Sequence, residues 1–314
     1  MSFRLGLVGL CTSHPESWVP IIRALQKEGL ADVEVTACWD SAETRLAGFA
    51  KEFATKLSIP KAVDRLEDML GEVDGVIVHT TNWDKHLEQA RPFVDANKPV
   101  LLDKPIVGNM KDINQLLDWV KQGKKITGGS SLRFTTAGAA FLAQPVAERG
   151  DVHTVFGGCG VDEYNYGIHA YSFACQVLGP GVQSAQCLGG TRQKHIKITW
   201  QTGQVAILAV GTVDKWLPFH LTAITNKNVA QLKPEGGSLY RPLLEACLPY
   251  MTGKVATPPL PMAQLLEPEL AAMAARQSWL NGGQVVNLSD LRHDDAGYDG
   301  TQFALGYRRA RLGA

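Results

Sequence analysis

The sequence has no excess of charge of either sign. Its 31 lysines and arginines balance 31 aspartates and glutamates, and the pI is about 7.1. Basic runs and arginine-rich helical stretches, which form the electrostatic footprint of nucleic-acid binders, are absent from it. We therefore expect a small molecule as the partner, and no nucleic acid.

Paired cysteines and long apolar runs are also absent. The six cysteines are scattered without C-x-x-C spacing, and no run approaches the roughly 20 apolar residues of a membrane-spanning helix. The start, MSFRLGLVGL, leads into a strand-like run rather than a signal peptide. These features predict a reduced, soluble, cytoplasmic protein with no membrane partner. Apart from His86 and His169, the histidines show no metal-ligand spacing, so we expect no metal.

Length and patterning predict two domains. The 314 residues exceed the roughly 250 to 300 at which single cores stop growing. Up to residue 128, short runs rich in Val, Ile and Leu alternate with amphipathic stretches, a pattern typical of parallel strands covered on both faces. Residues 1–128 are expected to form an α/β Rossmann-like, doubly wound parallel sheet that binds a nucleotide. Helices are predicted at 16–29, 41–53, 84–97 and 109–123.

The pattern changes after residue 128. A helix-like segment at 134–150 precedes strand-like runs at 193–203, 204–214 and 219–228, and a long helical region follows. Residues 129–314 are therefore expected to form an α+β domain with a predominantly antiparallel open sheet that binds substrate. Two of these runs carry apolar residues that face both ways, which predicts a homodimer or homotetramer joined through them.

The first predicted turn, in LGLVGLCTSHPESW, lacks the glycines of a dinucleotide fingerprint. The G-x-G-x-x-G pattern is met by Gly9 at its first position, whereas Cys11 and His14 occupy the other two. Thr12 and Ser13 can still cap a helix that has a proline in its first turn. Free backbone N–H groups would then face a pyrophosphate.

An acidic residue ends the second predicted strand. Asp40 can accept hydrogen bonds from an adenosine ribose, and a charge placed at a helix start is the competing interpretation. Because a carboxylate repels a ribose phosphate, we expect NAD as the cofactor, with NADP as the alternative.

The stretch PVLLDKPIVGN places a lysine directly after a buried strand. Lys104 follows the carboxyl end of that strand, where doubly wound sheets bind ligands. Pro105 restricts the conformation of the residue before it. For an isolated Lys-Pro, a solvated turn lysine is the competing interpretation.

Four segments together resemble the Gfo/Idh/MocA family of NAD(P)-dependent oxidoreductases. DGVIVHTTNWDKHLEQA resembles the family's strand, Thr/Pro/Asn turn and helix-opening histidine. VLLDKPIVGNMKDINQLL is similar to its Glu-Lys-Pro motif, with Asp103 replacing the glutamate. SSLRF resembles the segment that opens the second domain. NYGIHAYSFACQVLG resembles the helix carrying Asp-x-Gly-x-His, with Asn165 replacing the aspartate and His169 retained.

The resemblance implies a nicotinamide cofactor in the first domain and a sugar-like substrate between the domains. Lys104 and His169 would act at the reacting hydroxyl. His169, with an ordinary pKa of about 6.5, would give and take the proton, and Lys104 would stabilise the alkoxide. The implied substrate contacts are Lys104, Arg133, Asn165 and His169. The implied cofactor contacts are Gly9, Cys11, Thr12, Ser13, His14, Asp40, Thr80, Asn82, His86, Asp103 and Lys104.

The expected reaction is hydride transfer between the nicotinamide and a secondary hydroxyl or keto group of a sugar, cyclitol or related polyol. One alternative is a redox-neutral NAD-dependent lyase or glycosidase of the same family. The other is a catalytically retired ligand-binding or sensor protein, an interpretation favoured by the altered glycine loop and by Asn165.

Overall fold

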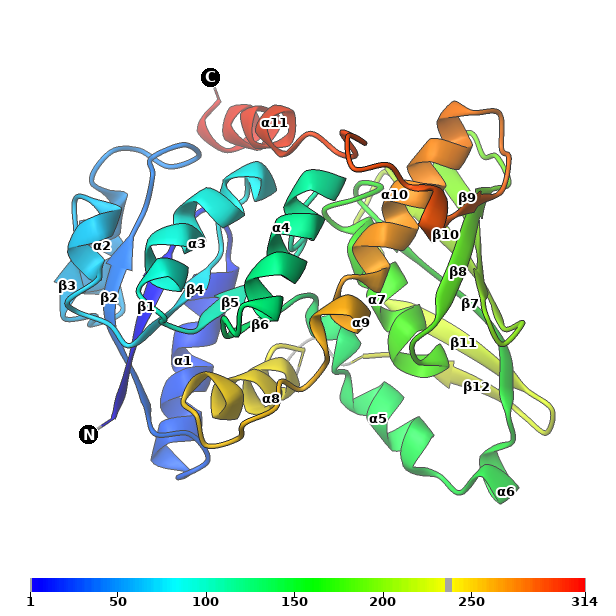
Figure 1. Ribbon diagram of the computed structural model, residues 1–314, viewed down its shortest axis with the longest axis horizontal. Helices are drawn as coiled ribbons and strands as arrows, with labels where there is room; N and C mark the ends of the chain where they lie inside the picture. Colours follow the sequence, from blue (N-terminus) through cyan, green and yellow to red (C-terminus); the bar gives the residue numbers. More distant parts are fainter. Residues whose placement is uncertain (1, 235–238, 314) are drawn as a thin grey trace.

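A parallel sheet forms the first domain, as the sequence predicts (Figure 1). The structure is a computed structural model and describes residues 2–234 and 239–313. The strand order is β3-β2-β1-β4-β5-β6, and every pairing is parallel. The strands are β1 (Phe3–Val8), β2 (Val33–Trp39), β3 (Lys61–Ala62), β4 (Gly75–Val78), β5 (Val100–Leu102) and β6 (Ile126–Gly128).

Helices cover both faces of this sheet, which explains why its strands are almost wholly apolar. Leu7 and Ile77 pack on one face with Trp18, while Val76 and Val78 belong to the core on the other face. Successive residues of a strand point to opposite faces, so a strand buried on both sides reads as a continuous apolar run. The covering helices are α1 (His14–Lys27), α2 (Phe49–Lys56), α3 (His86–Asp95) and α4 (Met110–Lys121).

The helix predicted at 41–53 is wrong in its first half. Only residues from Phe49 onward are helical. Asp40 Oδ1 accepts a hydrogen bond from the N–H of Ala42 at 2.8 Å, which closes a turn directly after β2. Ala42 has φ 58° and Gly48 has φ 89°, and left-handed residues interrupt a right-handed helix. The region 41–48 is therefore a loop at the carboxyl edge of the sheet.

The second domain contains a mixed, mostly antiparallel sheet, as expected. Its order is β12-β11-β7-β10-β9-β8-β13, and β7 and β10 make its one parallel pairing within the described residues. The strands are β7 (Val152–Gly160), β8 (Val182–Cys187), β9 (Gln193–Trp200), β10 (Val205–Gly211), β11 (His220–Thr225), β12 (Val229–Leu232) and β13 (Val286–Asn287).

Helices α7 (Gly167–Leu178) and α10 (Glu267–Leu280) pack on the face of this sheet turned toward the first domain (Figure 1). The segment 134–150 forms two short helices, because Pro145 interrupts it. These and the remaining short helices are α5 (Thr136–Ala143), α6 (Val146–Arg149), α9 (Met262–Leu265) and the 3₁₀ turns Leu66–Met69, Trp83–Lys85, Ser131–Arg133 and Leu288–Asp290.

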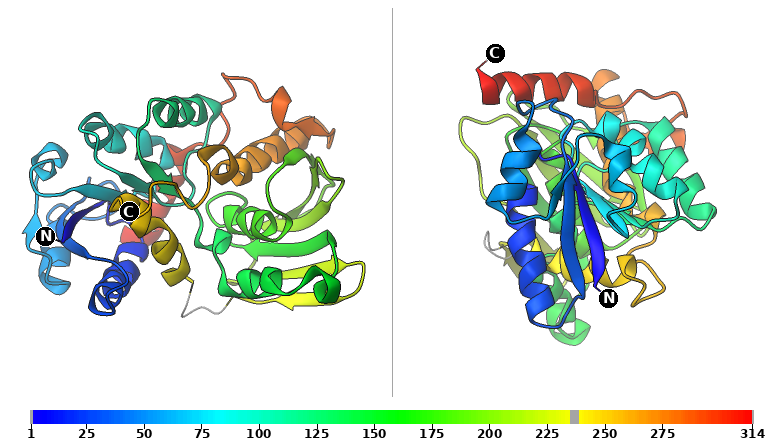
Figure 2. Two further views of the ribbon diagram at one scale, coloured as in Figure 1. Left: turned by 60° about the horizontal axis from the view of Figure 1, so that its bottom comes forward. Right: turned by 90° about the vertical axis from the view of Figure 1, so that its left-hand side faces the viewer.

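Two later helices return to the first domain. Helix α8 (Arg241–Met251) places Leu244 and Leu248 in the core that contains Trp18. Helix α11 (Gly300–Leu312) lies across the top of the first domain, above the loops that follow its strands (Figure 2, right). Residue 128 ends β6, the last strand of the parallel sheet, so the predicted domain boundary at 128/129 falls at the end of that sheet. Helices α8 and α11 nevertheless come after this boundary in the chain and pack on the first domain. No helix within the described ranges is long and apolar enough to span a membrane.

Gly128 provides a test of the close packing of β6 against β5. It has φ +137°, and a Cβ there would lie 1.9 Å from the carbonyl oxygen of Leu102. Gly123 has φ +81° but nothing within 4 Å of such a Cβ. We expect Gly123→Ala to cost about 1 kcal/mol of unfolding free energy through backbone strain alone. Gly128→Ala should cost at least about 3 kcal/mol, because it also displaces β5. Equal losses in urea unfolding would contradict this packing.

Candidate active site

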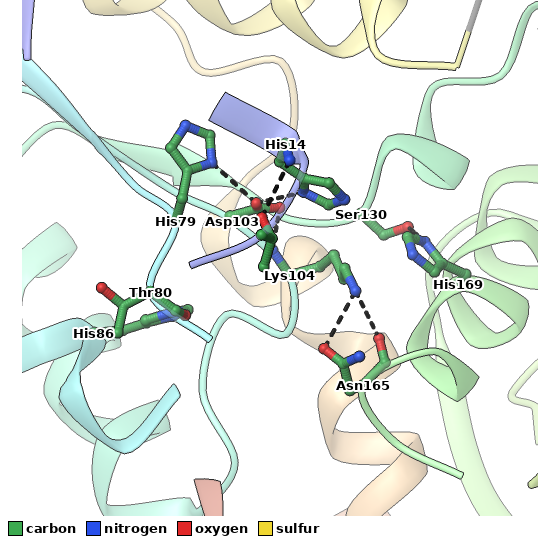
Figure 3. A network of polar contacts seen from close by, with 10 residues as sticks. His14, His79, Thr80, His86, Asp103, Lys104, Ser130, Asn165 and His169 are labelled. Atoms are coloured by element: carbon green, nitrogen blue, oxygen red, sulfur yellow. Dashed lines mark hydrogen bonds and ion pairs between the residues drawn. The ribbon is translucent and has the colours of Figure 1, made fainter. Parts of the chain in front are cut away.

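Lys104 reaches across the domain boundary from the end of β5. Its Nζ donates to the backbone oxygen of Asn165 at 2.9 Å and to Asn165 Oδ1 at 3.3 Å (Figure 3). Nζ also lies 5.0 Å from the centroid of the Tyr166 ring. Burial lowers the pKa of Lys104, and the negative charges of Asp103 and Asp162 oppose that shift. Lys104 is therefore a held, partly desolvated cation rather than a solvated turn residue.

His169 lies on α7, in the second domain. Its Nδ1 is 2.7 Å from Ser130 Oγ, which also accepts the N–H of Leu132 at 3.1 Å. Within the described residues, Nε2 has no hydrogen-bond partner. Burial, and then the positive charge of Lys104, lower the pKa of His169 well below its ordinary value. The imidazole is therefore neutral at pH 7, and the ordinary pKa of about 6.5 assumed for it does not apply.

Asp103 is the centre of a buried polar network. Its Oδ2 lies 2.6 Å from Nδ1 of His14 and 3.0 Å from Nδ1 of His79, and its Oδ1 accepts the N–H of Lys104 at 2.7 Å (Figure 3). Burial would raise the pKa of Asp103, but the two imidazoles outweigh it and hold the pKa well below the usual range. Burial lowers the pKa of His79. The carboxylate is thus a buried anion stabilised by N–H donors.

Sequence reasoning missed His79 and the grouping of these three side chains. Each contributes one potential ligand atom, and the three atoms lie within 4.8 Å of one another. Their N···O separations are those of direct hydrogen bonds. His14 and His79 are 89 and 24 residues from Asp103 along the chain, so no local spacing could reveal the cluster. The expectation of no metal stays a prediction.

The loop after β1 keeps its first glycine for a steric reason. Gly9 has φ +78°, and a Cβ there would lie 2.3 Å from Thr80 Oγ1. Ser13 precedes α1 without a side-chain cap. Within the described residues, the backbone N–H groups of Thr12 and Ser13 have no acceptor. Unpartnered donors at a helix N-terminus suit the phosphates of a dinucleotide.

Asp40 and the residues after β4 lie at the same edge of the sheet. The carboxylate of Asp40 accepts the N–H groups of Leu10 at 2.7 Å and of Ala42 at 2.8 Å. Cys11 Sγ also donates to Oδ2 at 3.9 Å, so Oδ1 is the oxygen that retains a second lone pair for a ribose hydroxyl. Asn82 donates to Glu43 Oε1 at 2.7 Å, which bridges the loops after β2 and β4. A cavity of about 490 Å³ beside these loops includes Trp39, Ser41, Glu43 and Gln89 in its lining, a size that suits part of a dinucleotide.

His86 is buried, and its ring nitrogens lie against two carbonyl oxygens. Nε2 is 2.6 Å from the oxygen of Thr80, and Nδ1 is 2.9 Å from the oxygen of Ile106. Thr80 Oγ1 donates to Gln89 at 2.5 Å. His86 therefore joins the segments that follow β4 and β5, and its polar atoms are occupied by protein.

Arg133 is buried between the domains, near Glu267 and Glu269 on α10. Its Nη1 has no hydrogen-bond partner within the described residues. Burial raises the pKa of Glu269 to about 7, while the N–H of Ile106 and the charge of Arg133 oppose this. Glu269 Oε1 accepts the N–H of Ile106 at 3.1 Å, so this cluster supports the segment that carries Lys104. Contact between Arg133 and a substrate stays a prediction.

Residues 3–128 match the family model described as an oxidoreductase family with an NAD-binding Rossmann fold. Over 147 residues the chain is 29% identical to 1,5-anhydro-D-fructose reductase of Ensifer adhaerens. This match covers 46% of this chain and 41% of that protein. Over 113 residues it is 39% identical to trans-1,2-dihydrobenzene-1,2-diol dehydrogenase of Danio rerio, covering 35% and 31%. The chain therefore spans well under half the length of these curated relatives.

Similarity of fold extends over most of the chain. The structure of scyllo-inositol dehydrogenase from Lactobacillus casei with bound NAD(H) and scyllo-inositol matches 92% of this chain and 100% of that chain, with a TM-score of 0.75 and 14% identity. The myo-inositol dehydrogenase from the same organism, in complex with NAD(H) and myo-inositol, matches 91% and 97%, again with a TM-score of 0.75 and 14% identity. Residues 3–128, which form the parallel-sheet domain, therefore match the Gfo/Idh/MocA oxidoreductase family.

Proposed function

We propose that the protein is an NAD-dependent oxidoreductase that interconverts a secondary hydroxyl and a keto group on a sugar, cyclitol or related polyol. The observation that carries the proposal is the pairing of Lys104 with His169 across the domain boundary. Lys104 is a partly desolvated cation at the end of β5, and neutral His169 presents an unpartnered Nε2. An alcohol oxidation needs both groups, a proton acceptor and a stabiliser of negative charge on oxygen.

The cofactor would lie along the carboxyl edge of the parallel sheet. The N–H groups of Thr12 and Ser13 would receive its phosphates, and Asp40 would accept its adenosine ribose hydroxyls. The same carboxylate disfavours a 2′-phosphate, so we propose NAD rather than NADP. A bound nicotinamide would take up, or deliver, the hydride of the substrate carbon.

The chain's own groups would manage the proton and the charge. In the oxidation, the hydroxyl proton would pass to Nε2 of His169 as the hydrogen on the same carbon leaves with its electron pair. Lys104 would donate to the oxygen while it carries negative charge, and the C–O bond would become C=O. Ser130 would hold the imidazole at Nδ1, and Asn165 would hold the ammonium group, so the proton acceptor and the charged donor are both oriented before substrate arrives.

The substrate class rests on the relatives. The similar proteins include an anhydrofructose reductase and dehydrogenases solved with inositols, which support a polyhydroxylated ring. Net formation of NADH from such a polyol would support the dehydrogenase. Turnover without net NADH would instead support the redox-neutral alternative.

We also propose that the protein is cytoplasmic and forms a homodimer or homotetramer through the open face of its second sheet. Ile207 on β10 is only partly buried and Phe156 on β7 is 44% exposed, and the two are paired in register. Apolar side chains grouped on an uncovered sheet face are commonly buried by another subunit. A monomer in light scattering at micromolar concentration would contradict this assembly.

Removing the Lys104 ammonium tests its role in the chemistry. We expect Lys104→Ala to lower kcat by about two to three orders of magnitude, since one preorganised charge donor is lost. Lys104→Arg should also be impaired, because it keeps the charge but changes the donor geometry. Steady-state kinetics on a polyol substrate, with thermal unfolding of each variant, would measure both effects. The matched control is Lys111→Ala, exposed on α4, which should retain wild-type turnover.

The pH dependence tests both groups. Because the pKa of His169 is lowered, the acidic limb of kcat/KM for oxidation should lie below pH 6.5. Activity should then fall as pH rises through the lowered pKa of Lys104, because the uncharged amine no longer stabilises an alkoxide.

Asn165→Asp sharpens this test. It places a carboxylate about 3.3 Å from Nζ, which should raise the pKa of Lys104 and move the alkaline limb to higher pH by roughly one unit. Asn97→Asp is the matched control, since Asn97 is exposed and its Oδ1 accepts from Lys124 at 2.6 Å, far from the site. An unshifted alkaline limb in Asn165→Asp would mean that it does not report Lys104.

A further inference from the structure

Helix α11 ends over the loop after β1, in which Cys11 and His14 stand at two of the three glycine positions of the dinucleotide fingerprint. Nη1 of Arg311 donates to the carbonyl oxygen of Cys11. Nε of Arg45, in the loop after β2, donates to the adjacent carbonyl oxygen, that of Leu10, at 3.2 Å. Two guanidinium groups from opposite ends of the chain therefore hold consecutive carbonyls of the loop after β1.

A third guanidinium lies nearby on α11. Nη1 of Arg308 donates to the carbonyl oxygens of Glu43 at 2.7 Å and Ala42 at 3.2 Å, in the loop that contains Arg45. In residues 2–234 and 239–313, no carboxylate oxygen lies within 4.0 Å of a nitrogen of these three arginines. Burial, and then the positive charge of Arg311, lower the pKa of Arg45. The negative charges of Glu16 and Asp40 oppose this shift, but within the described residues none of the three guanidinium groups pairs directly with a carboxylate.

These directly unpaired guanidinium groups border the N–H groups of the loop after β1 that have no acceptor within the described residues. Thr12 and Ser13, whose N–H groups have no acceptor within the described residues, directly follow the carbonyl that Arg311 holds. A guanidinium has five N–H donors, of which Arg311 uses one here, and its planar fork matches a phosphate. An anion received by these backbone groups would lie within reach of the guanidinium.

We propose that Arg311, assisted by Arg45 and Arg308, forms a diphosphate-recognition site that binds the dinucleotide of the proposed function. In a glycine-rich loop the backbone itself approaches the pyrophosphate. Here the side chains of Cys11 and His14 occupy two of the three glycine positions, and α11 supplies charge from the side. This inference rests on the proposed function, because its ligand is the proposed cofactor.

Two phosphate sources on the ligand must be distinguished. NAD carries only the diphosphate, whereas NADP also carries a 2′-phosphate on the adenosine ribose. A site for the diphosphate treats both nucleotides alike, while a site for the 2′-phosphate affects only NADP. Titration of the full-length chain with each nucleotide separates the two cases.

The experiment is isothermal titration calorimetry of NAD⁺ and NADP⁺ with the wild type, Arg311→Ala and Arg311→Lys. The matched control is Arg309→Ala, because Arg309 is exposed on the same helix and its side chain makes no hydrogen bond within the described residues. We expect Arg311→Ala to weaken both nucleotides by about tenfold or more, as loss of a charge-assisted contact does. Arg311→Lys should recover part of that loss, and Arg309→Ala should stay within about twofold of the wild type.

Several results would overturn the site. One is an affinity of Arg311→Ala for both nucleotides equal to that of the wild type, and another is a loss of affinity confined to NADP⁺. The third is an equal loss of affinity in Arg309→Ala, which would indicate a general effect of positive charge on this helix. A wild type that binds neither nucleotide would instead overturn the proposed cofactor and this site together. If thermal unfolding shows that Arg311→Ala does not fold, Arg311→Lys against Arg309→Ala makes the same comparison.

Discussion

The carboxylate of Asp103 is the constraint on which the candidate site depends. It is almost fully buried, and a buried anion is tolerated only when donors surround it. Its donors come from three places: His14 at the start of α1, His79 after β4, and the backbone of Lys104 itself. One charge therefore fixes the relative positions of three segments at the carboxyl edge of the sheet, where the chemistry would occur.

The segment after Asp103 is held from both domains. Ile106 donates its N–H to Glu269 on α10, and the hydroxyl of Tyr164 donates to the carbonyl oxygen of Val107. Lys104 completes these contacts through Asn165. Positioning by several buried contacts limits the motion of the ammonium group, which is what preorganised charge stabilisation requires. Asn165 thus orients the lysine through both its backbone oxygen and its amide oxygen.

What could be predicted from the sequence was local. The strands of the parallel sheet could be predicted because residues such as Val76 to Val78 are apolar on both faces. Helix α4 could be predicted because its apolar residues recur at helical spacing. The loop at 41–48 was missed because its left-handed residue at Ala42 depends on a hydrogen bond to Asp40, and alanine carries no turn signal. Lys104 and His169 were predicted as site residues from a pattern of four segments, not from either residue alone, and their catalytic role stays a prediction.

The rest of the site is formed by contacts between distant segments. The lowered pKa of His169 arises from burial and from the charge of Lys104, neither of which is encoded near residue 169. The same is true of the arginines on α11, which reach loops at the other end of the chain. Sequence spacing predicts what an element is, whereas burial and distant partners decide what its side chains can do.

The side chains at the two positions where the fingerprint has glycine, Cys11 and His14, leave the N-terminus of α1 uncovered. Cys11 is fully buried, with Sγ 3.9 Å from Asp40 Oδ2, and the ring of His14 is directed to Asp103. Both side chains therefore point into protein contacts rather than over the free N–H groups of Thr12 and Ser13. The substitutions remove the flexibility of glycine without filling the position an anion would take. A loop fixed in this way can contribute only its remaining donors, so further binding energy must come from side chains outside it.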